Sequence, residues 1–328
     1  MIADRTALVL GATGGVGGEA ARRLAAHGWS VRAMRRGSAK SPGPSETPGC
    51  AWVRGDAMRP SDVASAAAGV SVIVHAVNPP GYRKWGEMVL PMVDNTIAAA
   101  RAAGARIVLP GTIYNFGPDA FPNINETSPQ NPITVKGRIR VEMERRLRVA
   151  ASEGASVLIV RAGDFFGPRP GNSWFSQGMI APGRPVTKIS YPGRAGVGHH
   201  WAYLPDVGET MAQLLDKRDA LDSFAVFHME GHWDADGEQM IAAIRKASGN
   251  PNVKVTRTPW ALMRLASPFV PLFRELVEMR YLWETPIRMD NRRLRAVLGE
   301  EPRTPLETAV RETLMGLGSL PRGPEPGK

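Results

Sequence analysis

The sequence predicts a doubly wound α/β protein with a parallel sheet and a smaller, mostly helical C-terminal part. Two observations predict this fold class. A short apolar run at 7–10 ends in a glycine-rich turn, which leads into a helical pattern at 19–28 and a second apolar run at 30–34. Short apolar runs then continue to alternate with helical patterns as far as 156–160. Because the first group fits one βαβ unit and the alternation repeats it, we expect a Rossmann-like sheet with helices on both faces.

The glycine-rich turn is the strongest local signal, because Gly11, Gly14 and Gly17 keep a three-residue spacing through it. A tight strand-to-helix turn needs glycine for an unusual φ, for close approach of a ligand to the backbone, and for packing of the helix on the sheet. The N–H groups at the helix start suit a diphosphate. A turn without a ligand is the alternative, but the βαβ order favours a dinucleotide site. The candidate cofactor residues here are Gly11, Thr13, Gly14, Gly15, Val16 and Gly17.

The same alternation predicts the other elements of the cofactor-binding part. Strands are expected at 51–53, 70–76, 106–109 and 156–160, and helices at 88–103 and 133–152. Another helix is expected from about residue 61, with Ser61 or Asp62 as its N-cap. The stretch 38–49 is rich in Ser, Pro and Gly and is expected to be a mobile loop.

Beyond Gly163 the alternation becomes irregular. We expect a helix at 206–217 with Asp206 as N-cap, a strand at 224–228, and helices at 238–246, 259–280 and 305–315. The predicted organisation is a cofactor-binding domain at 1–165 to which 200–230 returns, a substrate-binding part made of 166–199 and 231–320, and a frayed tail at 321–328. Ligands are expected in the crevice beyond the carboxyl ends of the strands.

The composition indicates a soluble globular protein, since 43% of its 328 residues are apolar and 22% are charged. The sequence shows no secretion signal at its N-terminus and no apolar stretch as long as a membrane span. Cys50 is the only cysteine, which excludes an internal disulfide and suits a reducing compartment. We therefore expect a cytoplasmic protein without a membrane partner.

The formal net charge of +10 raises nucleic acid as a partner. Much of the basic charge lies at 136–148, however, where Glu142 and Glu144 are interleaved with it, as on a solvated helix face. No RNA- or DNA-binding motif is present, and no His or Cys pair has metal-ligand spacing with a third partner. We therefore expect neither nucleic acid nor a metal ion, and we attribute the charge to attraction of an anionic cofactor.

Six motifs follow one another along the chain: Gly11-x-x-Gly14-x-x-Gly17, Gly55-Asp56, His75-Ala76-Val77, Arg161-Ala-Gly-Asp-Phe-Phe-Gly-Pro, Trp201-Ala-Tyr-Leu-Pro-Asp-Val and Leu298-Gly-x-x-Pro. Their order resembles that of the extended short-chain dehydrogenase/reductase superfamily, the NAD(P)-dependent epimerase/dehydratase-like proteins, over nearly the entire chain. The resemblance implies that Asp56 and Ala57 lie near the adenine of the cofactor. It also implies that Ala76 and Val77 lie beside the cofactor at the end of the fourth strand.

The residues at the end of the second strand favour NADP(H) over NAD(H), although NAD stays an alternative. A carboxylate there would hold the ribose 2′-hydroxyl of NAD, whereas arginine accommodates the 2′-phosphate of NADP. The strand ends in Arg35 and Arg36, with no acidic residue nearby. Solvation of both side chains in a loop is the other interpretation.

The catalytic residues are where the sequence departs from this resemblance. The superfamily pairs a Tyr acid/base with a Lys one helical turn later, and adds a Ser or Thr near the substrate. Thr112, five residues before Gly117, is at the Ser/Thr position. Alignment of the helix through Glu142, however, puts Thr134 at the position of the Tyr and Arg138 at that of the Lys. A threonine hydroxyl is too weak an acid for this role near neutral pH.

Three interpretations of this departure are open. Tyr114 or a desolvated Lys136 could transfer the proton instead, although each also fits a structural or solvated position. The protein could bind the cofactor without turning it over. The reaction could also need only hydride delivery, with Thr112, Tyr114 and Arg138 near the substrate oxygen.

The substrate residues are less specific. Asp164 stands where the superfamily usually has Asn, and no set of arginines for a nucleotide-sugar diphosphate is evident. Phe165 and Trp174 suggest an aromatic lining or an ordinary core, and His200 is a candidate acid/base in place of a structural histidine.

We therefore predict an atypical NADP(H)-dependent oxidoreductase for a small carbonyl or alcohol substrate. A nucleotide-sugar epimerase or dehydratase and a non-catalytic NADP-binding sensor are the alternatives. The resemblance also implies a homodimer.

Overall fold

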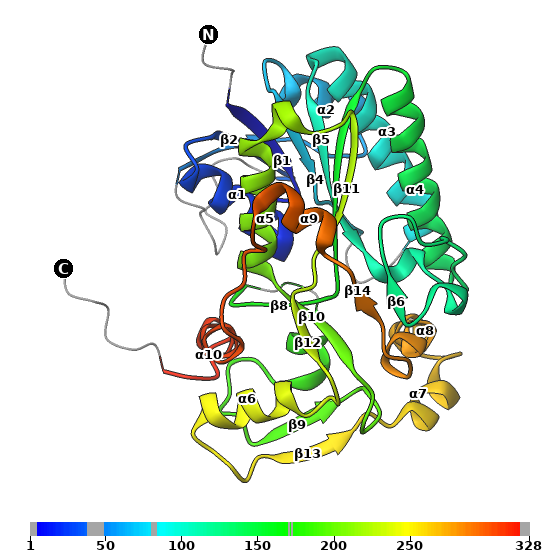
Figure 1. Ribbon diagram of the computed structural model, residues 1–328, viewed down its shortest axis with the longest axis vertical. Helices are drawn as coiled ribbons and strands as arrows, with labels where there is room; N and C mark the ends of the chain where they lie inside the picture. The colour runs from blue at the N-terminus through cyan, green and yellow to red at the C-terminus, as the bar shows by residue number, and fades with distance from the viewer. Residues whose placement is uncertain (1–4, 38–48, 80–83, 170, 172, 322–328) are drawn as a thin grey trace, which may run out of the picture.

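The computed structural model describes residues 5–37, 49–79, 84–169, 171 and 173–321. The stretch 38–48, most of the expected loop, and residues 322–328 of the expected tail lie outside this part of the chain. The expected fold class is confirmed: a central parallel sheet is covered by helices on both faces (Figure 1).

The central sheet has seven strands, in the order β11-β7-β5-β4-β1-β2-β3, and every neighbouring pair is parallel. The order reverses direction at β1 and β4, which places the carboxyl ends of these two strands at the switch point where doubly wound sheets bind ligands. The strands are β1 (Thr6–Leu10), β2 (Ser30–Arg35), β3 (Cys50–Arg54), β4 (Val72–His75), β5 (Arg106–Thr112), β7 (Ser156–Ala162) and β11 (Phe224–His228).

Two apolar layers flank the sheet, because its central strands carry apolar side chains on both faces. One layer is covered by α2 (Pro60–Ala67), α3 (Trp85–Ala103) and α4 (Val135–Ser152). The other is covered by α1 (Gly15–Ala26), α5 (Leu204–Asp216) and α9 (Arg292–Leu298). Helix α9 belongs to the range expected in the substrate-binding part, yet Leu294 packs into the core of the central sheet.

A second core, rich in aromatic side chains, lies beyond the carboxyl ends of the central strands (Figure 1). Its short strands were not predicted, because two to five residues carry too little periodicity to separate a strand from a loop. They are β8 (Asp164–Phe166), β9 (Lys188–Tyr191), β10 (His199–Tyr203), β12 (His232–Asp234) and β13 (Lys254–Arg257), and they lie with α6 (Gln239–Ser248) and α10 (Leu306–Gly316).

The other elements connect the two cores. Strands β6 (Asn123–Ile124) and β14 (Arg288–Met289) form a small parallel pair. Helices α7 (Trp260–Ala266) and α8 (Pro271–Glu278) and the short helical turns η2 (Ile113–Asn115), η3 (Pro118–Ala120), η4 (Phe175–Met179), η5 (Arg218–Ala220) and η6 (Arg280–Trp283) complete the described chain.

Proline corrects three sequence-based expectations. The helix expected at 259–280 is broken into α7, α8 and η6, because Val270 precedes Pro271 and is extended, as residues before proline prefer. Helix α2 is capped by Arg59, with Pro60 at its first position, and not by Ser61 or Asp62.

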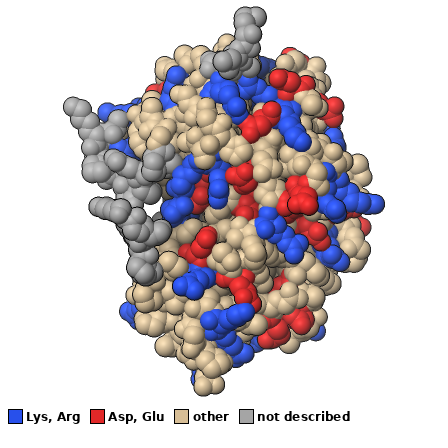
Figure 2. Space-filling view, turned by 60° about the vertical axis from the view of Figure 1, so that its left-hand side comes forward, with Lys and Arg blue, Asp and Glu red and all other residues tan. Residues whose placement is uncertain are grey.

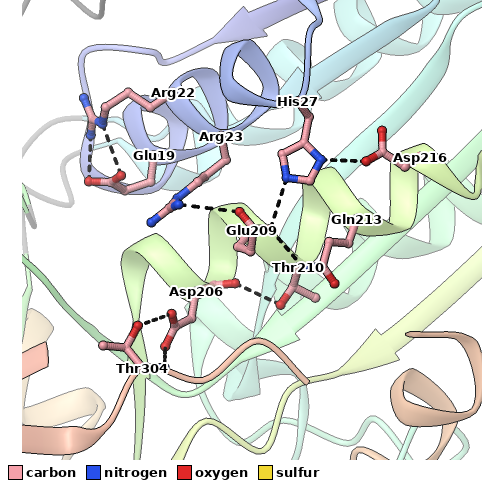
Figure 3. Close-up of polar contacts among 10 residues, drawn as sticks. All are labelled: Glu19, Arg22, Arg23, His27, Asp206, Glu209, Thr210, Gln213, Asp216 and Thr304. Atoms are coloured by element: carbon pink, nitrogen blue, oxygen red, sulfur yellow. Dashed lines mark hydrogen bonds and ion pairs between the residues drawn. The ribbon is translucent and has the colours of Figure 1, made fainter. Parts of the chain in front are cut away.

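Helix α5 likewise begins one residue before Pro205, with Tyr203 as its N-cap. Asp206 therefore lies inside the first turn and does not cap it. Its carboxylate instead accepts hydrogen bonds from the N–H of Thr304, at 2.8 Å, and from the Thr304 hydroxyl, at 2.7 Å (Figure 3).

Candidate functional site

The glycine-rich turn forms a cradle in which side chains are excluded by the backbone itself. Gly11 has a φ of +86°, and a Cβ added to it would overlap the carbonyl of Ala76. A Cβ added to Gly17 would overlap the carbonyl of Gly11. The N–H of Gly14 donates to the Gly11 carbonyl at 2.9 Å and closes the turn. These contacts keep the backbone bare where the first helix begins.

The start of α1 fits an anionic group. Gly14 is the N-cap and has no side chain to bond the first N–H groups, and no acidic residue lies in the first turn. Gly15 and Val16 are half-buried and Thr13 is exposed, so these backbone atoms border open space. The positive end of the helix dipole therefore suits an anionic group such as a diphosphate, and Gly171 lies close to the Gly15 N–H.

The ends of β4 and β3 supply the other expected cofactor residues. Ala76 and Val77 follow β4 and lie directly against Gly11, so the structure brings them into the cradle. Asp56 follows β3, and its carboxylate accepts from the N–H of Met58 at 3.0 Å, which shapes the turn that carries the buried Ala57.

Arg35 ends β2 with its guanidinium 5.0 Å from the centre of the Trp52 ring. Stacking on an aromatic face orients a guanidinium without removing its charge. Arg36 is exposed, and Arg54 on β3 lies opposite Arg35 in the register. The edge of the sheet beside the cradle is therefore cationic.

Helix α4 presents one buried polar face, and Arg138, which the sequence alignment put at the position of the superfamily's Lys, does not lie on it. Lys136, Arg140 and Glu144, spaced four residues apart, are all buried, whereas Arg138 is exposed. Thr134 is the N-cap, and its hydroxyl accepts from the N–H of Gly137 at 2.9 Å. Anchoring the helix on Glu144 in place of Glu142 would have aligned Lys136 with the superfamily's Tyr and Arg140 with its Lys.

Lys136 is held by two carboxylates of α8. Its side chain is 2% exposed, and its ammonium pairs with Glu278 at 2.8 Å and with Glu275. The ammonium is thereby neutralised in a buried place, which is the condition under which proteins keep a buried charge.

Thr112 and Tyr114 lie next to this end of α4. Thr112 is the last residue of β5, and its hydroxyl accepts from the N–H of Tyr114 at 3.3 Å. The carbonyl of Tyr114 lies against Gly137, where a Cβ would overlap it. The structure therefore brings Thr112 and Tyr114 alongside the helix turn that carries Lys136.

Arg140 connects α4 to the end of β4. Its guanidinium donates to the side-chain oxygen of Asn78 at 3.0 Å and lies 5.2 Å from the centre of the Trp85 ring. Nearby, burial and then the charge of Arg140 lower the pKa of His75 to about 3, so this histidine is neutral at physiological pH. Arg140 thus holds a positive charge against Asn78, three residues beyond the end of β4 and next to Val77 of the cradle.

A second buried ion pair braces the same helix. The guanidinium of Arg161, on β7, donates to Glu144 at 3.1 Å and lies 3.0 Å from a ring nitrogen of His228. Burial and the Arg161 charge lower the pKa of His228 well below its usual range. Neither Glu144 nor His228 was among the predicted site residues. The four-residue spacing of Lys136, Arg140 and Glu144 was a signal for Glu144, and the sequence held no comparable signal for His228.

On the substrate side, the structure pairs Asp164 with His199 and not with His200. The carboxylate of Asp164 lies 2.9 Å from a ring nitrogen of His199, whose ring stacks on Trp283 at 3.6 Å. Successive side chains of a strand point to opposite faces, so His200 faces away, towards Trp233. Burial, above all, lowers the pKa of His200 to about 3.

Trp174 and Phe165 differ in their surroundings. Trp174 contacts Trp260 and Trp283 at ring distances of 5.9 and 5.5 Å, in the aromatic core beside Asp164. Phe165 is half-buried and packs on the core of the central sheet.

The structure also bears on the distribution of surface charge, on metal binding and on membrane spans. Figure 2 shows basic and acidic side chains mixed across one face of the molecule, as on a solvated surface. Among the described residues no group of three His, Cys, Asp or Glu side chains could hold a metal ion. Within the same part of the chain, no helix is long and apolar enough to cross a bilayer.

We compared the chain with protein families and with solved structures. Residues 11–171 match the family model described as NAD(P)H-binding. The structure of MoeE5 in complex with UDP-glucuronic acid and NAD is 19% identical, with a TM-score of 0.74 over 95% of this chain and 98% of that one. A nucleoside-diphosphate-sugar epimerase from Pseudomonas aeruginosa is 18% identical, with a TM-score of 0.68 over 96% of this chain and 97% of that one.

The Bordetella bronchiseptica enzyme WbmH, in complex with NAD+, is 15% identical, with a TM-score of 0.66 over 95% of this chain and 98% of that one. At these identities the likeness is one of fold. No curated protein sequence matches this chain.

Proposed function

We propose that this chain, which has the fold of the extended short-chain dehydrogenase/reductase superfamily and an NAD(P)H-binding region, is an atypical NADP(H)-dependent oxidoreductase for a small carbonyl or alcohol substrate. The observation that carries the proposal is the buried face of α4, which presents Lys136 and Arg140 one helical turn apart beside the cradle. These two positive groups take the places of the superfamily's Tyr and Lys. When bound, the nicotinamide supplies or accepts the hydride.

The cradle residues Gly11 to Gly17 hold the cofactor diphosphate in this proposal, and Arg35 with Arg36 holds the 2′-phosphate. The preference for NADP(H) is supported by the orientation of Arg35 on Trp52 and by the lack of an acidic residue at the end of β2. One charge-assisted contact of this kind contributes about 1.5–3 kcal/mol.

Arg140 would bond the hydroxyl groups of the nicotinamide ribose. A guanidinium presents several N–H donors in a fixed plane, so it can replace a lysine in binding, although it cannot give up its proton near neutral pH. Proton transfer to the substrate oxygen then falls to the ammonium of Lys136, with the Thr112 hydroxyl as a second donor. Glu275 and Glu278 balance the charge of Lys136 before the transfer.

The test compares Arg140→Met with Arg138→Met, a matched substitution on the exposed face of the same helix. NADPH affinity is measured by quenching of nicotinamide fluorescence, and turnover by cofactor oxidation across a panel of carbonyl compounds. We expect Arg140→Met to weaken NADPH binding about tenfold or more and Arg138→Met to leave it unchanged. Equal effects in the two variants would contradict the role of Arg140.

A separate variant tests the proton donor. Lys136→Met should bind NADPH normally and lose turnover, because the proposed step needs its ammonium only after the cofactor is bound. Binding of the cofactor by the wild-type protein with no turnover of any carbonyl would favour the sensor alternative.

A nucleotide-sugar epimerase is the second candidate, favoured by the fold shared with MoeE5, whose structure holds UDP-glucuronic acid and NAD. Its test is a thermal-shift screen of UDP-sugars, followed by chromatographic separation of epimers. A rise in the unfolding temperature with UDP-sugars would favour this candidate over the oxidoreductase.

A further inference from the structure

Exposed apolar side chains of the described chain are concentrated in one place. Among these residues seven large apolar side chains are exposed, and six of them lie in the two segments 133–135 and 262–270. Phe269 is 85% exposed and Leu265 is 76% exposed, which is unusual for side chains of this size. We call this surface the apolar tip; it consists of Ile133, Val135, Leu262, Leu265, Phe269 and Val270.

Helix α8 links the two segments of the apolar tip: it follows Val270 directly, and its last residue, Glu278, bonds to the start of α4. The N–H of Val135, at the start of α4, donates to Glu278 of α8 at 2.5 Å. Figure 1 shows α7 and α8 at the periphery of the molecule, beyond the end of the central sheet at which α4 begins. A concentration of exposed apolar side chains at one edge marks an interaction surface.

The charges around the apolar tip are basic. Arg264 on α7 and Arg274 on α8 are exposed, as is Arg138 on α4. The two carboxylates of α8, Glu275 and Glu278, are directed to Lys136 and are mostly buried. Glu275 also lies 3.8 Å from the exposed guanidinium of Arg274, which leaves Arg264 and Arg138 as the arginines of this surface without an acidic partner among the described residues. The surface therefore offers apolar groups and guanidinium groups together, a combination complementary to an anionic lipid headgroup layer.

We propose that the apolar tip docks on an anionic lipid bilayer and holds the protein there as a peripheral anchor. Leucine and phenylalanine side chains enter the boundary between headgroups and acyl chains, and the exposed arginines contact lipid phosphates. The helices α7 and α8 lie on the bilayer and do not cross it, in keeping with their lengths of seven and eight residues. This proposal departs from the sequence-based expectation that the protein has no membrane partner.

Docking in this way would bring the start of α4, and with it Lys136, close to the bilayer surface. The inference does not depend on the chemistry proposed for Lys136, because it concerns the exposed side chains of the apolar tip, whereas Lys136 is buried. Binding to vesicles can therefore succeed or fail independently of NADPH turnover.

The experiment is co-sedimentation of the full-length protein with vesicles of phosphatidylcholine alone or of phosphatidylcholine mixed with phosphatidylglycerol. We expect binding to the mixed vesicles, weakening as salt is raised, and little binding to phosphatidylcholine alone. Leu265→Glu combined with Phe269→Glu should reduce binding at least about tenfold, since each buried large side chain contributes about that much to partitioning.

Val149→Glu is the matched control, because Val149 is the seventh exposed apolar residue and lies near the other end of α4. It should bind vesicles as the wild type does. The unfolding temperature of each variant should equal that of the wild type, since the altered side chains are exposed. Failure of the wild type to bind anionic vesicles would overturn the proposal, as would undiminished binding by the double variant. A dimer in solution that the double variant dissociates, without vesicle binding, would assign the tip to a second copy of the chain and would equally overturn it.

Discussion

The glycine cradle and the buried face of α4 meet at the same edge of the central sheet, yet they are built in opposite ways. The cradle works because side chains are missing: Gly11 and Gly17 let backbone approach backbone, and Ala76 closes the gap. Gly11 follows β1, Gly17 lies in α1 and Ala76 follows β4. The face of α4 works through charged side chains, and each needs a charged or polar partner from another element.

The need for these partners explains why we expect mutations to destabilise the α4 face more than the cradle. Lys136 depends on α8, which begins 135 residues later in the sequence, and Glu144 depends on Arg161 of β7. Leaving a buried charge without its partner lowers the free energy of unfolding far more than slight strain in a turn does. The comparison teaches that the cofactor cradle depends on close approach of backbone to backbone, while the proposed catalytic face depends on the pairing of buried charges.

The largest effect on stability is expected from Glu144→Gln, which leaves the buried guanidinium of Arg161 without its carboxylate. We expect the free energy of unfolding to fall by about 3–5 kcal/mol, measured by urea denaturation. Glu142→Gln is the control two residues away. Hydrogen bonds from Arg145 and Arg146 hold the pKa of Glu142 at about 2, but this pairing is near the surface and its loss should cost less than about 1 kcal/mol. Equal losses of unfolding free energy in the two variants would contradict the expected difference between the buried pair and the surface pair.

Gly17→Ala should damage the cradle more than the fold. The new methyl group would meet the Gly11 carbonyl, and relieving this overlap should cost about 1–3 kcal/mol of unfolding free energy. NADPH titration should show no binding at concentrations that saturate the wild type. Gly86→Ala, in the first turn of α3, is the control, because a Cβ there meets no atom within 4 Å. Normal NADPH binding by Gly17→Ala would show that the cradle does not contact the cofactor.

Arg35→Gln should weaken NADPH binding about ten- to a hundredfold and leave NADH binding unchanged, because only NADPH carries the 2′-phosphate. Fluorescence titration with both cofactors measures the ratio. Arg32→Gln is the control on the same strand, since the Arg32 guanidinium donates to the carbonyls of Ala66 and Ala68 and not towards the strand end. A loss of equal size for both cofactors would indicate that Arg35 does not read the phosphate.

The smallest effect concerns His27, and it shows that even the helix of the cradle depends on a distant partner. His27 ends α1 and bonds Asp216 at 2.6 Å and Glu209 at 3.0 Å, both on α5 (Figure 3). Burial lowers the pKa of His27, but the hydrogen bonds to Asp216 and Glu209 outweigh this and raise it above its usual value of 6.5.

The sign of the pH dependence follows from that shift. A raised pKa in the folded state means that the pairing stabilises fully below about pH 6.5 and is lost as the pH rises through the folded pKa. His27→Gln should therefore lower the unfolding free energy by up to about 1 kcal/mol at pH 6 and by much less at pH 9. A difference between wild type and variant that grows with pH would contradict the pairing. His200 is the opposite case to His27, because its pKa is lowered to about 3 and the folded protein holds it in the neutral form.

Local patterns predicted the elements of the first 162 residues well. Apolar runs and glycine spacing are properties of neighbouring residues, so β1, α1, β2 and β5 lie close to their expected ranges. The expected fold class and a nicotinamide-binding region of the chain are confirmed. The cofactor preference, the substrate and the catalytic residues stay proposals.

The proposed catalytic face of α4 could not be predicted from local patterns in the same way. Glu142 and Glu144 are two residues apart, and each gives a plausible alignment of the helix. Burial of Lys136 and Arg140, with exposure of Arg138, distinguishes them, and burial depends on what packs against the helix. The pairing of Asp164 with His199, which the sequence analysis did not predict, has the same origin, since the direction of a strand's faces is set by its neighbours.

By itself, the sequence determined the alternation of strands and helices and the bare backbone of the glycine turn, because these depend on periodicity and on residues that are close along the chain. Only the tertiary structure decided which charged side chains are buried together and which apolar side chains stay exposed. These outcomes depend on contacts between distant residues, and the free energy of a charge or an apolar group is set by its surroundings and not by its position in the sequence.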